Sequence, residues 1–126
     1  MLVDMQLEKQ EIVYEAKGQH LLLTLSGCRI DLLNDERALK QVLEKAAVAT
    51  GATVLKLESQ KFQPQGVTAI AVLAESHASL HTYPESGVVF FDCFTCGQTC
   101  NPSLSIPVLV EALGPVSYQQ QLVERG

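Results

Sequence analysis

The chain has 126 residues, a formal net charge of -5 and 47% hydrophobic residues. This length suits one domain spanning residues 1–126, because a chain of this size can bury roughly two-thirds of its unfolded surface without a metal or disulfide. The acidic balance argues against a nucleic-acid partner, since phosphates attract clustered Lys and Arg. No stretch approaches the roughly 18 apolar residues of a membrane span, and residues 1–17 lack the apolar run of a signal peptide. We therefore expect a cytoplasmic protein that binds neither membrane nor nucleic acid.

The four cysteines are an even number, but nothing in the sequence indicates secretion, so free thiols are expected. Three of them, Cys93, Cys96 and Cys100, lie close together without the second cysteine pair of a zinc site, and no metal is predicted. Cys93 alternates within an apolar run and is expected in the core. Cys96 precedes Gly97 at a strand end, where a partly exposed thiol can be reactive.

The first half of the chain predicts one strand and one helix. Residues 1–17 form a polar N-terminal arm, in which residues 12–14 could make a short strand or an interface. An apolar run at residues 20–25 is typical of a buried strand. Leucine, valine and alanine then recur at three- and four-residue steps through residues 35–50, which predicts an amphipathic helix. Asn34 is expected to cap this helix and Gly51 to end it.

The second half predicts a run of strands, a helix and a last strand. The expected strands are residues 53–62, 67–73, 78–83, 88–94 and 116–122. In residues 78–83, Ala78, Leu80 and Thr82 face one side and the residues between them face the other. The second helix is expected to start at Asn101 and Pro102, with Pro107 distorting it. The order β-α-β-β-β-β-α-β predicts an α+β fold, a two-layer sandwich of a mostly antiparallel sheet with two helices on one face. The other face is expected to carry the site or a partner subunit.

Reactive residue types gather at Glu75–Glu85, directly after an apolar strand. Ser76 could be an ordinary turn serine, but a strand that holds its backbone rigidly can also strain the peptide before it. His77 and His81 can carry protons near neutral pH, although a histidine on a polar strand face is more often solvated. No G-x-S-x-G surrounds Ser76, which argues against a hydrolase triad. Phe62 could be core or a platform for a flat ring, and Glu85 could accept hydrogen bonds from ligand hydroxyls.

Two segments, ESHASLHTYPE at Glu75–Glu85 and DCFTCG at Asp92–Gly97, resemble the bacterial and archaeal S-adenosylmethionine decarboxylases. The likeness extends over most of the chain beyond residue 17. These enzymes are pyruvoyl-dependent, so the resemblance implies that the Glu75–Ser76 bond breaks itself and that Ser76 becomes a covalent pyruvoyl group. Such a group forms a Schiff base with the substrate amine and acts as an electron sink that no coded side chain provides. An α/β sandwich and a homodimer of cleaved protomers are also implied.

The resemblance further implies a role for each matching residue. His81 would assist processing by proton transfer, and Cys96 would donate a proton to the decarboxylated carbon. Phe62 would stack on adenine and Glu85 would bind the ribose hydroxyls. Thr68 stands where such enzymes often carry a processing serine, and its hydroxyl can still form hydrogen bonds.

The expected activity is decarboxylation of S-adenosylmethionine, which supplies the aminopropyl donor for spermidine synthesis. Two alternatives stay open at this point. A pyruvoyl enzyme of this kind could act on a basic amino acid such as arginine or ornithine. A homologue that never cleaves itself could act only by binding.

Overall fold

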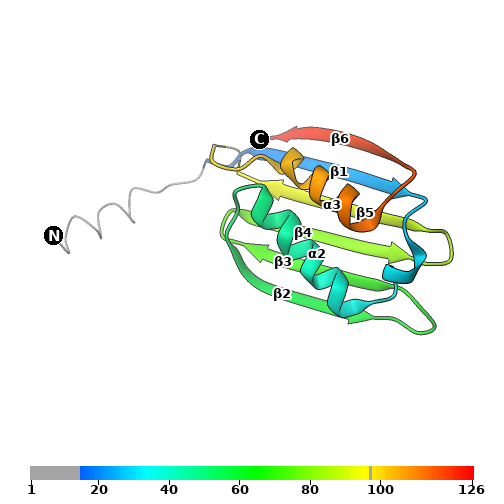
Figure 1. Ribbon diagram of the computed structural model, residues 1–126. Helices are drawn as coiled ribbons and strands as arrows, with labels where there is room; N and C mark the ends of the chain where they lie inside the picture. Colours follow the sequence, from blue (N-terminus) through cyan, green and yellow to red (C-terminus); the bar gives the residue numbers. More distant parts are fainter. Residues whose placement is uncertain (1–14, 97) are drawn as a thin grey trace.

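The computed structural model describes residues 15–96 and 98–126, and within these ranges it forms one antiparallel sheet covered by two helices (Figure 1). The elements are β1 (Gly18–Ser26), the 3-10 turn η1 (Ile30–Leu32), α2 (Glu36–Ala49), β2 (Val54–Lys61), β3 (Val67–Leu73), β4 (Ser76–Tyr83), β5 (Val88–Thr95), the 3-10 turn η2 (Pro102–Leu104), α3 (Ser105–Leu113) and β6 (Ser117–Arg125). The strand order is β2-β3-β4-β5-β1-β6. The predicted α+β sandwich, with both helices on one face, is confirmed. The strand expected at residues 12–14 lies outside the described residues.

The core lies between the helices and the inward side of the sheet. Helix α2 buries its predicted apolar stripe, and α3 buries a shorter one. Strand β4 follows the expected alternation, since Ala78, Leu80 and Thr82 are buried while the residues between them are half-buried. Each fully buried leucine contributes about 1.5–3 kcal/mol relative to an exposed one. Burial of one face therefore fixes which side chains each strand presents on its other face.

Two predictions about helix starts are wrong. Asp35, rather than Asn34, caps α2, because η1 leads the chain into the helix one residue later and leaves Asp35 in an extended conformation, where its carboxylate accepts from the Ala38 amide at 3.1 Å. Asn34 instead accepts from the Gly66 amide at 2.8 Å, a contact between distant segments. The second helix does not start at Asn101 and Pro102. Asn101 caps the turn η2, and α3 begins after this turn, at Ser105. Pro107 lies in the first turn of α3, where a missing N–H costs little, so the helix beyond it is undistorted.

The outward face of the sheet carries no helix from the described part of the chain (Figure 1). Several large apolar side chains on its strands are exposed by more than 40%, namely Leu22, Ile70, Val72 and Phe90. Those of Leu22, Ile70 and Phe90 also line a hollow on this face. No helix among the described residues is long and apolar enough to cross a bilayer.

Candidate active site

Ser76 begins β4 directly after the short turn that joins it to β3, and its backbone is unusual. Its φ is +154°, and it is the only residue other than glycine with a positive φ in the described part of the chain. Such a conformation costs an L-residue about 1–3 kcal/mol and persists only where neighbouring contacts enforce it. Here Ser76 is held between Leu73 of β3 and Thr95 of β5 by the sheet register. The sequence-based expectation of a strained, well-held peptide at this position therefore has a structural counterpart.

The carbonyl that precedes Ser76 accepts a hydrogen bond from the end of β5. The Cys96 amide donates to the Glu75 carbonyl oxygen at 3.3 Å. A backbone N–H at this position polarises the carbonyl and can stabilise negative charge that develops on its oxygen. The Glu75 carboxylate accepts from the Thr53 amide at 2.9 Å, which fixes the turn from its other side. The Glu75–Ser76 peptide is thus both strained and polarised.

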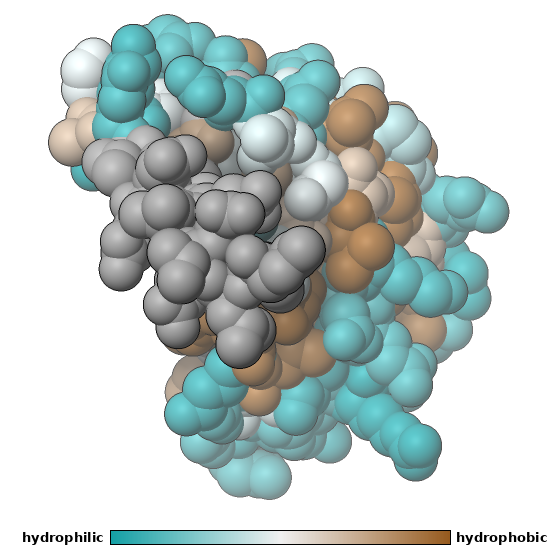
Figure 2. Space-filling model, turned by 90° about the vertical axis from the view of Figure 1, so that its left-hand side faces the viewer, coloured by the Kyte–Doolittle hydropathy of each residue, from teal (hydrophilic) through white to brown (hydrophobic). Residues whose placement is uncertain are grey.

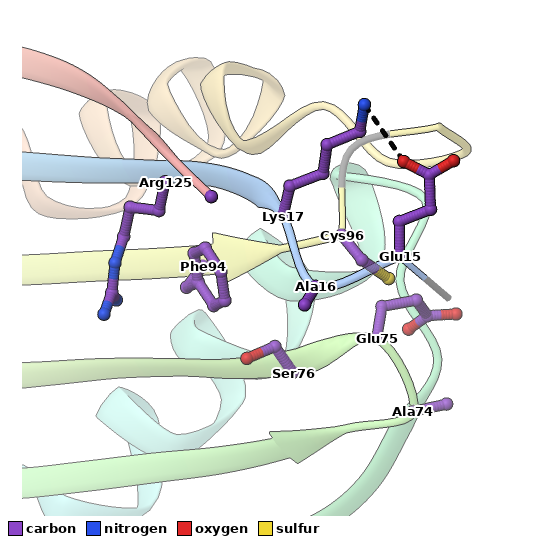
Figure 3. Close-up of a pocket in the computed structure, with 10 residues that line it drawn as sticks. Glu15, Ala16, Lys17, Ala74, Glu75, Ser76, Phe94, Cys96 and Arg125 are labelled. Atoms are coloured by element: carbon purple, nitrogen blue, oxygen red, sulfur yellow. Dashed lines mark ion pairs between the residues drawn. The ribbon is translucent and has the colours of Figure 1, made fainter. Parts of the chain in front are cut away.

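Glu75, Ser76 and Cys96 line one cavity of about 450 Å³ at this end of the sheet. Figure 3 shows Cys96 and Ser76 on neighbouring strand ends around one opening, with Phe94 beside them. The segment Glu15–Lys17, Ala74, Arg125 and Gly126 also line it. Seen from this end, the molecule exposes apolar surface next to polar side chains (Figure 2). The cavity is large enough for a small organic ligand.

Other expected site residues lie elsewhere on the outward face. Thr68 and His81 line a second cavity of about 270 Å³, where Thr68 Oγ1 lies 2.5 Å from His81 Nδ1. The ring of Phe62, which is 40% exposed, lies 5.9 Å from the His81 ring. Glu85 lies in the turn after β4, where Gln65 Nε2 donates to its carboxylate at 3.5 Å. These four residues therefore group around the far end of β4.

The two groups are well separated within one protomer. Ser76 and His81 are five positions apart on β4, which corresponds to about 16 Å at the rise of a strand. They line different cavities. The structure therefore brings Ser76 together with Glu75 and Cys96, but it does not bring His81 to Ser76 in the same chain.

Sequence reasoning missed a polar cluster next to Ser76, formed by His20, His77 and Asp92. Asp92 Oδ2 lies 2.7 Å from His20 Nε2 and 3.5 Å from His77 Nε2, and Ser76 Oγ lies 3.2 Å from His77 Nδ1. Both histidines stand opposite Phe94, one on each neighbouring strand, so Asp92 is a diagonal neighbour of both. Only the sheet register reveals this, because His20 is far from the other two in sequence.

This cluster offers the donor set of a metal site, with one atom from each residue within 4.8 Å of the others. The hydrogen bonds give it a different assignment. Arg125 Nη1 lies 3.2 Å from His20 Nδ1, and because a guanidinium can only donate, Nδ1 must accept. The proton of a neutral His20 is then on Nε2 and points at Asp92. In this arrangement His20 Nε2 serves as a hydrogen-bond donor to Asp92.

The sequence profile described as S-adenosylmethionine decarboxylase matches residues 19–126. The chain belongs to this family. Among its relatives, the S-adenosylmethionine decarboxylase proenzyme of Brevibacillus brevis is 45% identical over 90% of this chain and 85% of its own. The proenzyme of Methanococcus maripaludis is 41% identical over 86% and 89%. Membership confirms the resemblance carried by the two motifs.

Solved structures from the family share the fold. The adenosylmethionine decarboxylase of Aquifex aeolicus superposes with a TM-score of 0.80 at 31% identity, covering 89% of this chain and 92% of that one. The Trypanosoma brucei AdoMetDC-delta26 monomer superposes with a TM-score of 0.61 at 15% identity, over 82% of this chain but only 45% of that one. The second likeness concerns the fold alone.

Within this family member, the cysteines differ in their surroundings. Burial, with a smaller contribution from the Asp92 carboxylate and Cys100, raises the pKa of Cys93 to about 12, and burial also raises the pKa of Cys28 and Cys100. Cys96 is half-buried and lines the large cavity. The prediction that Cys93 is a core residue is confirmed. Cys96 is thus the accessible thiol of the four.

Proposed function

We propose that this chain is a proenzyme that cleaves its own Glu75–Ser76 bond, converts Ser76 into a pyruvoyl group and decarboxylates S-adenosylmethionine. The observation that supports this most strongly is the strained backbone of Ser76 beside a carbonyl that accepts from the Cys96 amide. Its relatives are proenzymes of S-adenosylmethionine decarboxylase. The product would serve as the aminopropyl donor for spermidine. A cytoplasmic location stays a prediction.

Self-cleavage begins when Ser76 Oγ attacks the Glu75 carbonyl carbon. Negative charge on the carbonyl oxygen is stabilised by the Cys96 N–H, and the C–N bond then breaks to leave an ester and a free amine on residue 76. Loss of the Ser76 α-proton expels the Glu75 carboxylate and leaves a dehydroalanine. This tautomerises to an imine, which takes up water and releases ammonia to give the pyruvoyl group. Strain in the starting peptide lowers the barrier, because it is relieved once the C–N bond breaks.

The position of residue 76 fits such a group, since residue 76 and Cys96 line the same cavity. The pyruvoyl carbonyl would supply an electron sink for the pair released when carbon dioxide leaves. Cys96 would donate a proton to the carbon that has lost carbon dioxide. Its partial exposure lets the thiol reach a bound substrate and regain its proton from solvent.

The proposal includes a homodimer that unites the two groups of site residues. The outward sheet face carries exposed apolar side chains of the kind that a second copy would cover. A two-fold axis that lies between the two outward faces, parallel to the sheets and perpendicular to β4, would set β4 of one copy antiparallel to β4 of the other. The start of β4, with Ser76, would then meet the end of the partner's β4, with His81 and Thr68. His81 would thereby reach a Ser76 that it cannot reach in its own chain.

In such a dimer Phe62 and Glu85 would approach the cavity of the opposite chain. There the exposed Phe62 ring could stack on adenine and Glu85 could accept from ribose hydroxyls. Phe62→Ala is expected to raise KM for S-adenosylmethionine by about 5- to 150-fold, because stacking on an aromatic ring contributes about 1–3 kcal/mol. Self-cleavage should be unaffected. Release of carbon dioxide from arginine or ornithine, and not from S-adenosylmethionine, would contradict the substrate assignment.

Two variants test self-cleavage and the dimer together. Ser76→Ala should give an intact, inactive chain, and His81→Ala should cleave poorly. When the two are expressed together, the His81→Ala chain should regain cleavage, because the Ser76→Ala partner supplies its histidine. Matched expression of each variant alone is the control. A cleaving Ser76→Ala chain would contradict the proposed function, whereas an unrestored mixture would contradict only the shared site.

A further inference from the structure

We infer that His77, oriented by Asp92, is the catalytic base that takes the proton from Ser76 Oγ when self-cleavage begins. This rests on the proposed function and assigns a step within it. His77 is the titratable side chain that contacts the Ser76 hydroxyl, and its Nδ1 lies 3.2 Å from Ser76 Oγ. General bases act at about this distance.

The hydrogen bonds around Asp92 fix the protonation pattern that this role needs. Arg125 donates to His20 Nδ1, and His20 Nε2 donates to Asp92 Oδ2. Ser79 donates to Asp92 Oδ1. Asp92 therefore acts as an acceptor towards every neighbour, as a carboxylate does.

His77 Nε2 faces the same carboxylate oxygen at 3.5 Å. A carboxylate on this side favours the tautomer with the proton on Nε2, which leaves Nδ1 free to accept from Ser76. It also stabilises the imidazolium that forms when the proton arrives. The arrangement is that of a serine, a histidine and an aspartate in series, the logic of activated nucleophiles on many folds.

The unusual backbone of Ser76 is part of this arrangement. Neighbouring residues in a regular strand point to opposite faces, so Ser76 and His77 would face apart. With φ at +154°, the Ser76 hydroxyl instead lies within reach of the next side chain. The conformation that strains the peptide therefore also pairs its nucleophile with a base.

The surroundings shield Asp92 and His20 from water more than they shield His77. The Phe94 ring lies 5.4 Å from the His20 ring and 6.1 Å from the His77 ring, and Arg125 covers it at 4.9 Å. Side-chain exposure is 17% for His20 and 25% for Asp92, against 44% for His77. Reduced exposure strengthens the interaction between the carboxylate and a histidine cation.

In the first step of self-cleavage, His77 carries one proton from the Ser76 hydroxyl to the nitrogen of the bond that breaks. The Ser76 hydroxyl proton moves to His77 Nδ1 as the bond from Oγ to the Glu75 carbon forms. The same proton then passes to the amide nitrogen of residue 76, whose bond to that carbon breaks. His77 returns to its neutral state, and no oxidant, metal or further reactant is needed. Removal of the α-proton in the later elimination is a separate step, and we assign the proton transfer proposed for His81 to it.

Hydroxylamine separates these two steps, because it cuts an ester but not an ordinary peptide bond. His77→Asn keeps a polar atom near Ser76 but removes the base, so the rate of self-cleavage should fall about 100-fold or more. The variant should also yield no hydroxylamine-dependent fragments. His81→Asn is the matched control on the same strand, and hydroxylamine should still cut it at Glu75–Ser76. Imidazole added to His77→Gly should restore part of the rate.

Cleavage of His77→Asn within about threefold of the wild-type rate would overturn the inference while leaving the proposed function intact. The same holds if His77→Asn stays uncut on its own but hydroxylamine cuts it as readily as His81→Asn. Self-cleavage of Asp92→Asn is measured in the same way as a second variant. A melting curve checks that each protein is folded. Chelation by EDTA should change nothing. If chelation stopped cleavage and zinc restored it, the cluster would be a metal centre and the inference would be wrong.

Discussion

The four cysteines should react with iodoacetamide at very different rates, and this difference can be worked out from their surroundings. Burial shifts the pKa of Cys93 from 9.0 to about 12, so the reactive thiolate is about 1,000-fold scarcer than for a free thiol. Its side chain is also fully buried, so the reagent must wait for the fold to open. Cys96 lines the open cavity. We expect Cys96 to be labelled more than about 100-fold faster than Cys93 in the folded protein.

The assay needs an enzyme other than trypsin, because no Lys or Arg lies between Lys61 and Arg125. Chymotrypsin can cut after Phe94 and so separate Cys93 from Cys96. Labelling at pH 8 is stopped at intervals. The masses of the fragments are then measured by mass spectrometry, and decarboxylation is measured on the same samples. Activity should fall in step with labelling of Cys96. Equal labelling of Cys93, or full labelling of Cys96 with activity intact, would refute the reasoning.

Three further outcomes follow from particular side chains. Thr82→Val should lower the free energy of unfolding in urea by about 2–4 kcal/mol, because the buried hydroxyl accepts from the Val67 amide at 3.0 Å and donates to the Leu33 carbonyl at 2.6 Å; a loss below about 0.5 kcal/mol would contradict this. Above pH 9 the unfolded Cys93 thiol releases its proton while the folded one keeps it, so the free energy of unfolding should fall by up to about 1.4 kcal/mol per pH unit towards pH 12. The corresponding slope in Cys93→Ala should be shallower, and equal slopes would count against the buried thiol. Cys96→Ala keeps the backbone N–H and should cleave itself normally, yet decarboxylate about 100-fold more slowly by gel and carbon dioxide assays; normal turnover would remove the thiol from the proton-donor role.

Much of the fold could be predicted because its signals are local. The alternation in residues 78–83 and the helical stripe in residues 35–50 depend only on which side chains must be buried. The cap of α2 was predicted one residue early, because Asn34 and Asp35 are equally good capping residues. Contact with Gly66, which is distant in sequence, decides between them.

The candidate site was predictable only where its parts adjoin. Ser76 and Cys96 follow from motifs at neighbouring strand ends, and they share a cavity. The separation of His81 from Ser76 follows from the strand rise, yet motif spacing alone suggested proximity. His20 could not be assigned a partner, because only the pairing of β1 with β5 brings it to Asp92.

The mass of the purified protein tests the central claim most directly. If Ser76 becomes the cofactor, denaturing mass spectrometry will find one chain of residues 1–75 and another of residues 76–126. The second chain will be lighter than its serine-initiated form by one molecule of ammonia, and borohydride reduction will add two hydrogens to it. An active preparation that consists of one intact chain, with the Ser76 hydroxyl still present, would contradict the account.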